Sequence, residues 1–274
     1  MDQVSVTAAS GLQARMEALD LVANNLANTT TGGFKLDREF YTLFTAADND
    51  ADGAATRLPL IQKQWTDFSQ GVLTPTGNAL DLALSGKGFF AVNGPNGPLY
   101  TRNGSFQLSP SGQLTTADGY AVRDTGGQPI QTQSQAPIEV AEDGSVTQSG
   151  QTLGQLQIVD FSDRSMLQKL GNSYFMPSDP KAVPIPAAEA TVQQGKTENS
   201  NVAPAESAVR LVGLMRQFVM LQKAITITTD MNKPALTRNP GYRALQSFWP
   251  QKITRDTKKN TFIVYQKNLL CSLC

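Results

Sequence analysis

The amino-acid sequence predicts an α+β fold, in which a mainly antiparallel β middle domain lies between long N- and C-terminal α-helices that pair as a coiled-coil-like core. Three observations predict it. Leucines recur every seven residues near the N-terminus, short apolar runs alternate with turn residues from about residue 70 to 185, and a broadly apolar stretch with helical spacing runs from 204 to 233. A chain of 274 residues is long enough to bury a sizeable core.

The first helix is predicted over residues 3 to 28. Leu12, Leu19 and Leu26 repeat every seven residues, and an apolar residue follows each of the first two by four. This spacing forms a narrow apolar stripe that suits packing against another helix. The sequence NNLANTTTGG at 24–33 favours a helix end, because asparagine and glycine tolerate the left-handed backbone of a C-cap and threonine continues a helix poorly.

The middle of the chain is predicted to be β-rich. Glycine, proline, asparagine, aspartate and serine recur every few residues, and short apolar runs lie between them. The runs are ALDLAL at 79–84, GFFAV at 88–92, SFQL at 105–108, YAV at 120–122 and LQIVDF at 156–161. Short strands with regular turn chemistry indicate an antiparallel sandwich or a barrel-like domain.

The second helix is predicted to begin at Pro204, which suits the first helical position, and to end at Pro234. Its apolar side chains form three rows with seven-residue spacing: Leu211, Phe218 and Ile225; Leu214 and Leu221; Val212 and Val219. So broad an apolar arc is expected to be covered on more than one side, either by other subunits or by the β domain of the same chain.

The sequence predicts five segments in all. These are an N-terminal helix and its cap, a connecting segment, a β-rich outer domain, a C-terminal helix and an atypical tail, at residues 1–33, 34–69, 70–200, 201–233 and 234–274. The tail is rich in lysine and arginine, and Asp256 is its only acidic residue. A basic, solvated segment is the simplest interpretation of such a composition.

Composition excludes several function classes. The formal net charge is +0, which gives no general attraction to nucleic acid or anionic lipid. Histidine is absent, which removes the commonest general base and the commonest metal ligand. The two cysteines, Cys271 and Cys274, offer no disulfide framework. The N-terminus lacks the pattern of a cleaved signal peptide, and no apolar run is long enough to span a bilayer.

Four short motifs resemble ligand sites but lack an essential part. ATVQQGKT at 190–197 is close to a phosphate loop, yet no helix is expected directly after it. DNDADG at 48–53 matches the first half of a calcium loop, but Pro59 stands where the bidentate glutamate belongs. GKGFFA at 86–91 leads into a strand rather than a helix. CSLC at 271–274 is a lone pair without two further zinc ligands.

Carboxylates in or near the β region offer no recognisable catalytic pair by their spacing. They are Asp67, Asp81, Glu139, Asp143 and Asp160. Paired carboxylates hydrolyse glycosides in many enzymes, but each of these five is better interpreted as a turn or solvent residue. The sequence therefore predicts no catalytic residue, no cofactor and no metal site.

Three blocks of the sequence resemble the axial proteins of the bacterial flagellar rod and hook. The first is TAASGLQARMEALDLVANNLANTTTGGFK, the second is GNALDLALSGKGFFAV followed by YTRNGSFQLSPSGQLTTADGYAV, and the third is QQGKTENSNVAPAESAVRLVGLMRQF. They stand in the family's order and cover about half of the chain. The junction residues of the family motif are Asn24, Asn25, Asn28, Gly33 and Phe34.

The resemblance implies a structural subunit of the flagellar basal-body rod, without enzyme activity or cofactor. Such a subunit polymerises through its terminal helices to form the shaft that transmits torque. Within the family the sequence most resembles proximal-rod subunits; a distal-rod or hook subunit is the alternative. An alternative from another class is a secreted β-rich carbohydrate-active enzyme or binding module. Subunit packing is expected from Leu12, Leu19, Leu26, Leu211, Leu214, Phe218 and Ile225.

The implied partners are other copies of the chain, other rod proteins and the flagellar type III export apparatus. Nucleic acid and membrane insertion are not expected. The implied location is the basal body in the cell envelope and periplasmic space, reached without a cleaved signal peptide. Residues 234–274 do not match the family pattern.

Overall fold

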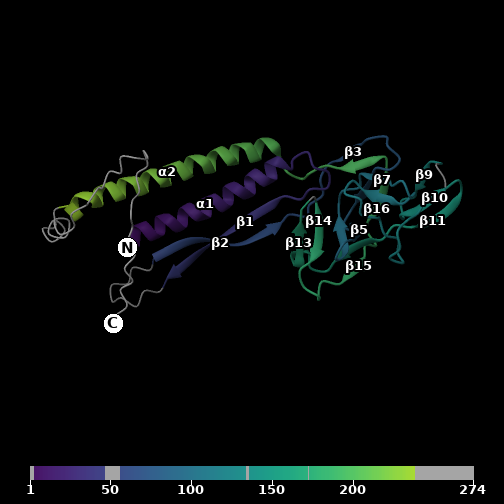
Figure 1. The fold of residues 1–274 in the computed structure, drawn as a ribbon, viewed down its shortest axis with the longest axis horizontal. Coiled ribbons are helices and arrows are strands. Elements are labelled where there is room, and N and C mark those ends of the chain that lie inside the picture. Colours follow the sequence, from purple (N-terminus) through teal and green to yellow (C-terminus); the bar gives the residue numbers. More distant parts are fainter. Residues whose placement is uncertain (1–2, 47–55, 134–135, 172, 238–274) are drawn as a thin grey trace, which may run out of the picture. The chain divides into compact units, whose positions relative to one another are not determined.

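The structure is a computed structural model that describes residues 3–46, 56–133, 136–171 and 173–237 (Figure 1). The chain forms two compact units, residues 1–223 and 224–274. Of the second unit, the structure describes 224–237, which is helical. The calcium-like motif at 48–53, most of the basic tail and both cysteines lie outside the described residues. The division into five segments stays a prediction.

Two α-helices are present in the described part of the chain: α1 at Gln3–Ala27 and α2 at Pro204–Thr237. They have 25 and 34 residues. The stretch after α1 ends that helix as expected, because Asn28 to Thr30 form a turn. The expected end at Pro234 is wrong, since α2 continues to Thr237. A proline inside a helix removes one backbone donor and costs stability, and it can kink the helix without ending it.

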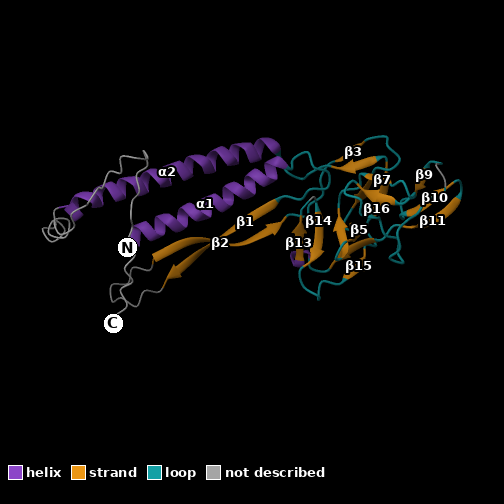
Figure 2. Cartoon of the chain, viewed as in Figure 1, coloured by secondary structure: helices purple, strands orange, loops and turns teal. Residues whose placement is uncertain are grey.

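The predicted coiled-coil-like core is also wrong, because no long seam joins the two helices. The first unit shows one small apolar cluster where they meet; it buries Ala18, Leu21, Val22 and Leu214, with Leu19 and Leu211 at its edge. A seven-residue repeat shows which face of a helix is apolar, but it does not show what covers that face. Here a β-hairpin also packs along α1 (Figure 2).

That hairpin consists of β1 at Asp37–Ala46 and β2 at Thr56–Thr66, which pair in antiparallel register with Asp37 opposite Thr66. It occupies most of the segment that the sequence predicted only as a connection. The register shifts by one residue between Phe40 and Tyr41, as in a β-bulge. The hairpin places its first and last residues beside the end of α1.

The middle of the chain is β-rich, as predicted, and its largest sheet has six antiparallel strands in the order β13-β14-β6-β5-β12-β15. These strands are β5 Phe89–Gly94, β6 Gly97–Thr101, β12 Ile158–Phe161, β13 Leu167–Leu170, β14 Tyr174–Pro177 and β15 Pro184–Pro186. A 3-10 helix at Arg164–Met166 leads into β13.

Smaller sheets accompany the six-stranded sheet. They are β11-β10-β9, β16-β4, β17-β3 and β7-β8. Their bounds are β3 Leu73–Pro75, β4 Leu82–Ser85, β7 Phe106–Leu108, β8 Leu114–Thr116, β9 Ile138–Val140, β10 Ser145–Gln148, β11 Gln151–Gln155, β16 Thr191–Gln194 and β17 Lys196–Glu198. Because β16 and β17 pair with β4 and β3, the chain returns to the start of the β region just before α2.

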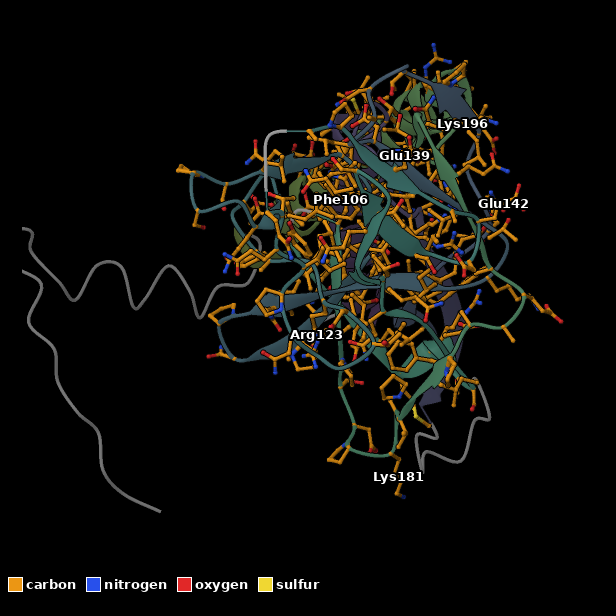
Figure 3. The ribbon with its side chains drawn as sticks, turned by 90° about the vertical axis from the view of Figure 1, so that its right-hand side faces the viewer. Phe106, Arg123, Glu139, Glu142, Lys181 and Lys196 are labelled. Carbon is orange, nitrogen blue, oxygen red and sulfur yellow. The ribbon has the colours of Figure 1, made fainter. Side chains whose placement is uncertain are left out.

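The run GFFAV is continuously apolar because β5 is buried on both faces. Phe90 and Val92 belong to one apolar cluster, whereas Phe89 and Ala91 belong to the other. Successive side chains of a strand point to opposite faces, so two cores need an uninterrupted apolar run. Figure 3 shows Phe106 of the first cluster among other side chains and Lys181 at the periphery.

Candidate functional site

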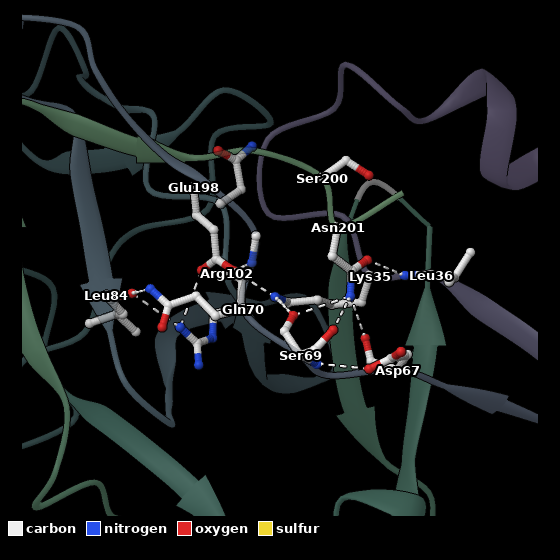
Figure 4. Close-up of polar contacts among 12 residues, drawn as sticks. Lys35, Leu36, Asp67, Ser69, Gln70, Leu84, Arg102, Glu198, Ser200 and Asn201 are labelled. Atoms are coloured by element: carbon white, nitrogen blue, oxygen red, sulfur yellow. Dashed lines mark hydrogen bonds and ion pairs between the residues drawn. The ribbon is translucent and has the colours of Figure 1, made fainter. Parts of the chain in front are cut away.

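The candidate site is the junction, which we define as Gly33–Asp37, Asp67–Gly71, Arg102–Asn103 and Glu198–Asn201. Here the segment leaving α1, the end of the hairpin and the segment leading into α2 meet the β domain (Figure 4). The junction thus ties both terminal helices to the β domain through side chains that are far apart in the sequence.

A buried ionic triad forms its centre. Lys35 Nζ donates to Glu198 Oε1 at 2.5 Å, and Arg102 Nη1 donates to Glu198 Oε2 at 3.2 Å. The side chains of Lys35 and Glu198 are 0% exposed and that of Arg102 is 2% exposed. Gly71 N adds a third hydrogen bond to the carboxylate, at 2.9 Å from Oε1.

Backbone carbonyls satisfy the two cations further. Lys35 Nζ donates to Ser69 O at 2.7 Å, and Arg102 Nη2 donates to Gly86 O at 2.6 Å. Arg102 also lies over the Phe89 ring, 5.6 Å from its centroid. Burial lowers the pKa of Lys35, and the Glu198 carboxylate opposes this effect. Burial lowers the pKa of Arg102 in the same way. Such a triad holds its parts in one arrangement, because losing one member leaves a buried charge unpaired.

Gly33 allows the close approach that brings Lys35 to this triad. Its backbone is left-handed, with φ +68, and its N–H donates to Glu198 O at 2.7 Å. A Cβ at this position would lie 2.3 Å from Asn103 N. Only glycine combines this φ with this contact at low cost.

Asn201 and Lys169 complete the junction. The Asn201 side chain accepts from Leu36 N at 2.7 Å and donates to Asp67 O at 2.8 Å, which bridges the chain on either side of the hairpin. Lys169 Nζ donates to Lys35 O at 2.7 Å and to Asp37 Oδ2 at 2.6 Å, and it lies 4.0 Å from the Phe34 ring centroid. Burial lowers the pKa of Lys169, while Asp37 opposes this.

The asparagines of the family motif take different positions. Asn25 is buried, and its amide exchanges two hydrogen bonds with the backbone of Asp37, donating to O at 2.8 Å and accepting from N at 3.0 Å. Asn28 caps α1 by donating to Asn24 O at 2.9 Å. Asn24 is exposed. Asn25 and Asn28 thus satisfy backbone groups within the chain.

Asn25→Asp is expected to lower the free energy of unfolding by about 1–3 kcal/mol, because the carboxylate at this buried position cannot donate to Asp37 O and this partly buried acceptor would lose its partner. Asn24→Asp is the matched control, since it adds the same charge at an exposed neighbouring position. Urea unfolding followed by circular dichroism measures both. Equal losses would show that the added charge, rather than the lost donor, explains the effect.

The residues predicted for subunit packing are not all brought together. Leu214 is buried, and Leu19 and Leu211 lie beside it in the cluster between α1 and α2. Leu12 and Leu26 on α1, and Phe218 on α2, are half-buried. Ile225 is half-buried and lies in the second unit. Their role in contacts between subunits stays a prediction.

The carboxylates of the β region accept hydrogen bonds within turns or form ion pairs. Asp67 accepts from Ser69 N, Asp81 from Thr76 Oγ1 and Asp143 from Ser145 N. Asp160 binds the Arg164 guanidinium through two hydrogen bonds of 2.8 and 2.7 Å. Burial raises the pKa of Asp160, but hydrogen bonds from Arg164 and Phe161 outweigh it and hold this pKa below its ordinary value of 3.8.

The Asp160–Arg164 pair is therefore expected to stabilise the fold above about pH 4. An unfolded aspartate titrates near 3.8, so the contribution is present above that pH and is lost as pH falls through the lower folded pKa. Asp160→Asn should lower the free energy of unfolding at pH 7 by about 1 kcal/mol and flatten its decline below pH 4. Arg164→Gln should produce a smaller change of the same kind, because Asp160 still accepts from Phe161 N, and the double variant should lose little more than Asp160→Asn. Additive losses in urea titrations would contradict the pairing.

The ligand-like motifs that lie in the described residues are parts of strands and turns. The phosphate-loop-like stretch at 190–197 contributes β16 and the first two residues of β17, and Lys196 donates to Gln193 Oε1. Gly86 and Gly88 both have positive φ and lead into β5. Among the described residues, no group of three or more histidine, cysteine or acidic side chains is placed to hold a metal ion.

Sequence reasoning missed the ionic triad. Lys35, Arg102 and Glu198 are separated by more than sixty residues each, and nothing in composition or periodicity pairs them. One signal was present: each stands inside one of the three blocks that resemble the flagellar family. The structure shows that these blocks meet at one point of the fold.

Three family models match the chain in the expected order. Residues 6–35 match "Flagella basal body rod protein", 83–148 match "Flagellar hook protein FlgE/F/G D1 domain" and 193–238 match "Flagellar basal body rod FlgEFG protein C-terminal". The triad takes one residue from each of these three regions.

Relatives cover most of the chain. The flagellar basal-body rod protein FlgF of Caulobacter vibrioides is 33% identical over 223 residues, which are 80% of this chain and 91% of the relative. The rod protein FlgG of Buchnera aphidicola subsp. Schizaphis graminum is 33% identical over 249 residues, at 81% and 94% coverage. FlgG of Borreliella burgdorferi is 32% identical over 250 residues, at 82% and 94%.

These matches define a structural protein of the bacterial flagellar rod. The chain belongs to the flagellar hook and basal-body rod protein family. This family is structural rather than enzymatic. Neither helix of the described part carries an apolar stretch sufficient to cross a membrane.

Proposed function

We propose that this chain polymerises through its terminal helices into the torque-transmitting shaft of the basal body. The observation that carries the proposal is the exposed apolar surface of α2 within the first unit. Val209, Val212, Met215, Val219 and Met220 are 48–74% exposed. A monomer rarely leaves so many large apolar side chains exposed on one helix unless a partner covers them.

The partners in this proposal are other copies of the chain and other rod proteins. The subunit reaches the periplasmic space through the flagellar export apparatus without a cleaved signal peptide, and it acts without nucleic acid or insertion into a membrane. A position in the proximal rod is the finer proposal. Relatives named FlgF and FlgG are both 33% identical to the chain, so this position needs its own test.

We also propose that the chain has no catalytic role. A carbohydrate-active enzyme, the alternative from another class, needs a carboxyl group with a raised pKa as its general acid. Among the described carboxyl groups with a shifted pKa, those of Asp67, Asp143 and Asp160 are all lowered. This direction supports structural roles for these groups in turns and ion pairs.

Val219→Glu tests the proposal. This residue is 58% exposed, so the charge should leave the fold intact and place a carboxylate in a contact that excludes water. In cells that lack the wild-type gene, we expect the variant to be exported but to form no rod, hook or motile flagellum. Gln217→Glu is the control, because it adds the same charge at an exposed position on α2. Normal rods with Val219→Glu would contradict polymerisation through this face.

A further inference from the structure

Asparagine followed by glycine is the dipeptide in which an asparagine side chain most readily loses its amide. The chain contains three such pairs, Asn93–Gly94, Asn96–Gly97 and Asn103–Gly104. Glycine favours the reaction because it has no Cβ, so its backbone nitrogen can approach the side chain of the preceding residue. The dipeptide is the same in all three pairs, but the fold gives each pair different surroundings.

The fold holds Asn103 and Gly104 in place. Gly104 is buried, and a Cβ there would lie 1.6 Å from Leu82 O. Gly104 O accepts a hydrogen bond from Leu82 N at 2.9 Å, and Asn103 Oδ1 accepts one from Ser105 N at 3.1 Å. This pair can therefore rearrange only when that part of the β domain opens.

Strand β5 holds Asn93 and Gly94. The N–H of Asn93 donates to Ala121 O at 2.8 Å, and Asn93 pairs with Pro98 of β6. A Cβ on Gly94 would lie 2.5 Å from Leu99 Cγ, so the backbone of Gly94 is closely packed. Reaction at this pair also requires local opening of the sheet.

Asn96 and Gly97 are the pair with open surroundings. Both residues are exposed, where the chain turns from β5 to β6. A Cβ on Gly97 would meet no atom within 4 Å. Gly94 and Gly97 form the last pair of the β5–β6 ladder, and the end of a ladder opens more easily than its middle. The Gly97 nitrogen can therefore reach the Asn96 side chain without disturbing any packed group.

We propose that Asn96 is a site of spontaneous deamidation, from which the fold protects Asn93 and Asn103. The Gly97 nitrogen attacks Asn96 Cγ, and the new N–C bond closes a succinimide ring. The Cγ–Nδ2 bond breaks, and Nδ2 leaves as ammonia with the proton that Gly97 N gives up. Water then opens the ring at either carbonyl, which leaves aspartate or isoaspartate in place of Asn96.

The products change the turn and leave the core intact. Each product places a carboxylate at the end of the β5–β6 hairpin, and isoaspartate also adds a methylene group to the backbone of the turn. The nearest apolar pair of the ladder, Val92 and Leu99, is 0% and 6% exposed and contains neither reacting residue. The modified chain should therefore stay folded and carry the new charge on its surface.

Peptide mass spectrometry of the full-length chain tests the proposal. The folded protein is incubated in mildly alkaline buffer made with heavy-oxygen water, which marks each asparagine that reacts. We expect Asn96 to take up the label about tenfold or more faster than Asn93 and Asn103, because reaction at those two residues waits for local unfolding. Fragment spectra separate Asn93 from Asn96, since both lie in the tryptic peptide 88–102. Labelling of Asn93 or Asn103 as fast as Asn96 would overturn the proposal.

The same incubation in guanidinium chloride is the control for the fold. In the unfolded chain the three pairs should react at similar rates, because each is asparagine followed by glycine. A preference for Asn96 that persists unchanged in the denaturant would come from the neighbouring sequence and would contradict protection by the fold. Asn96→Ser should abolish the fast labelling of the folded chain and leave the slow labelling of Asn93 and Asn103 as it was. Fast labelling that remains in this variant would also refute the assignment to Asn96.

Discussion

Glu198→Gln is expected to lower the free energy of unfolding of the full-length chain by about 3–5 kcal/mol. The change keeps the size of the side chain and removes its charge. Lys35 and Arg102 would then be two cations that have lost the carboxylate in contact with them, in a site where Lys35 is fully buried. Urea unfolding at pH 7, followed by circular dichroism, measures the loss. In cells the same variant should form few rods, because the junction would open.

The size of this loss of free energy follows from the hydrogen bonds that the Glu198 carboxylate accepts. It accepts hydrogen bonds from Lys35, Arg102 and Gly71, which belong to three separate segments of the chain. A surface ion pair contributes 0–1 kcal/mol at most sites, because water replaces the lost partner. At this junction water has no access to the lysine, so the uncompensated charge sets the cost.

Alkaline pH gives a second readout of the same variant. Burial already lowers the pKa of Lys35 from its ordinary value of 10.5, and removing the Glu198 charge removes the largest opposing effect. The unfolded chain would then bind more protons than the folded variant at pH values below 10.5, so the stability of the variant should rise with pH in that range. Its deficit relative to the wild type should therefore shrink between pH 7 and pH 10.

Glu142→Gln is the matched control, because it removes the same charge from an exposed position. Its effect should stay within about 0.5 kcal/mol. A loss below about 1 kcal/mol for Glu198→Gln would contradict the importance of the buried triad. A deficit that does not change with pH would instead indicate that Lys35 does not carry the uncompensated charge.

The helices and the β-rich middle could be predicted from the sequence because the patterns that indicate them lie within short stretches of the chain. The leucine repeat and Pro204 placed the two helices, and runs such as GFFAV between turn residues placed strands. The same reasoning failed for the helix partner. Leu12 and Leu26 are only half-buried, whereas Ala14 and Ala18 are buried, and no periodicity reveals which structure lies against a stripe.

The site was only partly predictable for a related reason. Gly33 and Asn25 were identified as junction residues from the motif, and the structure gives each a physical role in the chain. Arg102 and Glu198 were not identified, because an ion pair 96 residues apart in the sequence leaves no local trace. Its existence depends on β17 pairing with β3, and this pairing is a product of the whole fold.

Gly33→Ala is expected to be as damaging as removal of the triad carboxylate, at a loss of about 3 kcal/mol or more. Two costs combine at this position. The backbone has φ +68, which costs a residue with a Cβ about 1–2 kcal/mol. The new methyl would also lie 2.3 Å from Asn103 N and 2.4 Å from Arg102 C, so the backbone beside the triad would have to move.

Gly77→Ala separates these two costs. Gly77 has φ +75, close to that of Gly33, but a Cβ there meets no atom within 4 Å. Its loss should be only the backbone strain, about 1–2 kcal/mol, and rods should form normally. The difference between the two variants in urea unfolding therefore measures the close contact at the junction alone. Equal losses of free energy of unfolding would mean that the backbone at the junction moves aside for the methyl group at no cost. In that case the close contact of Gly33 with Arg102 and Asn103 would not be what holds the two helices against the β domain.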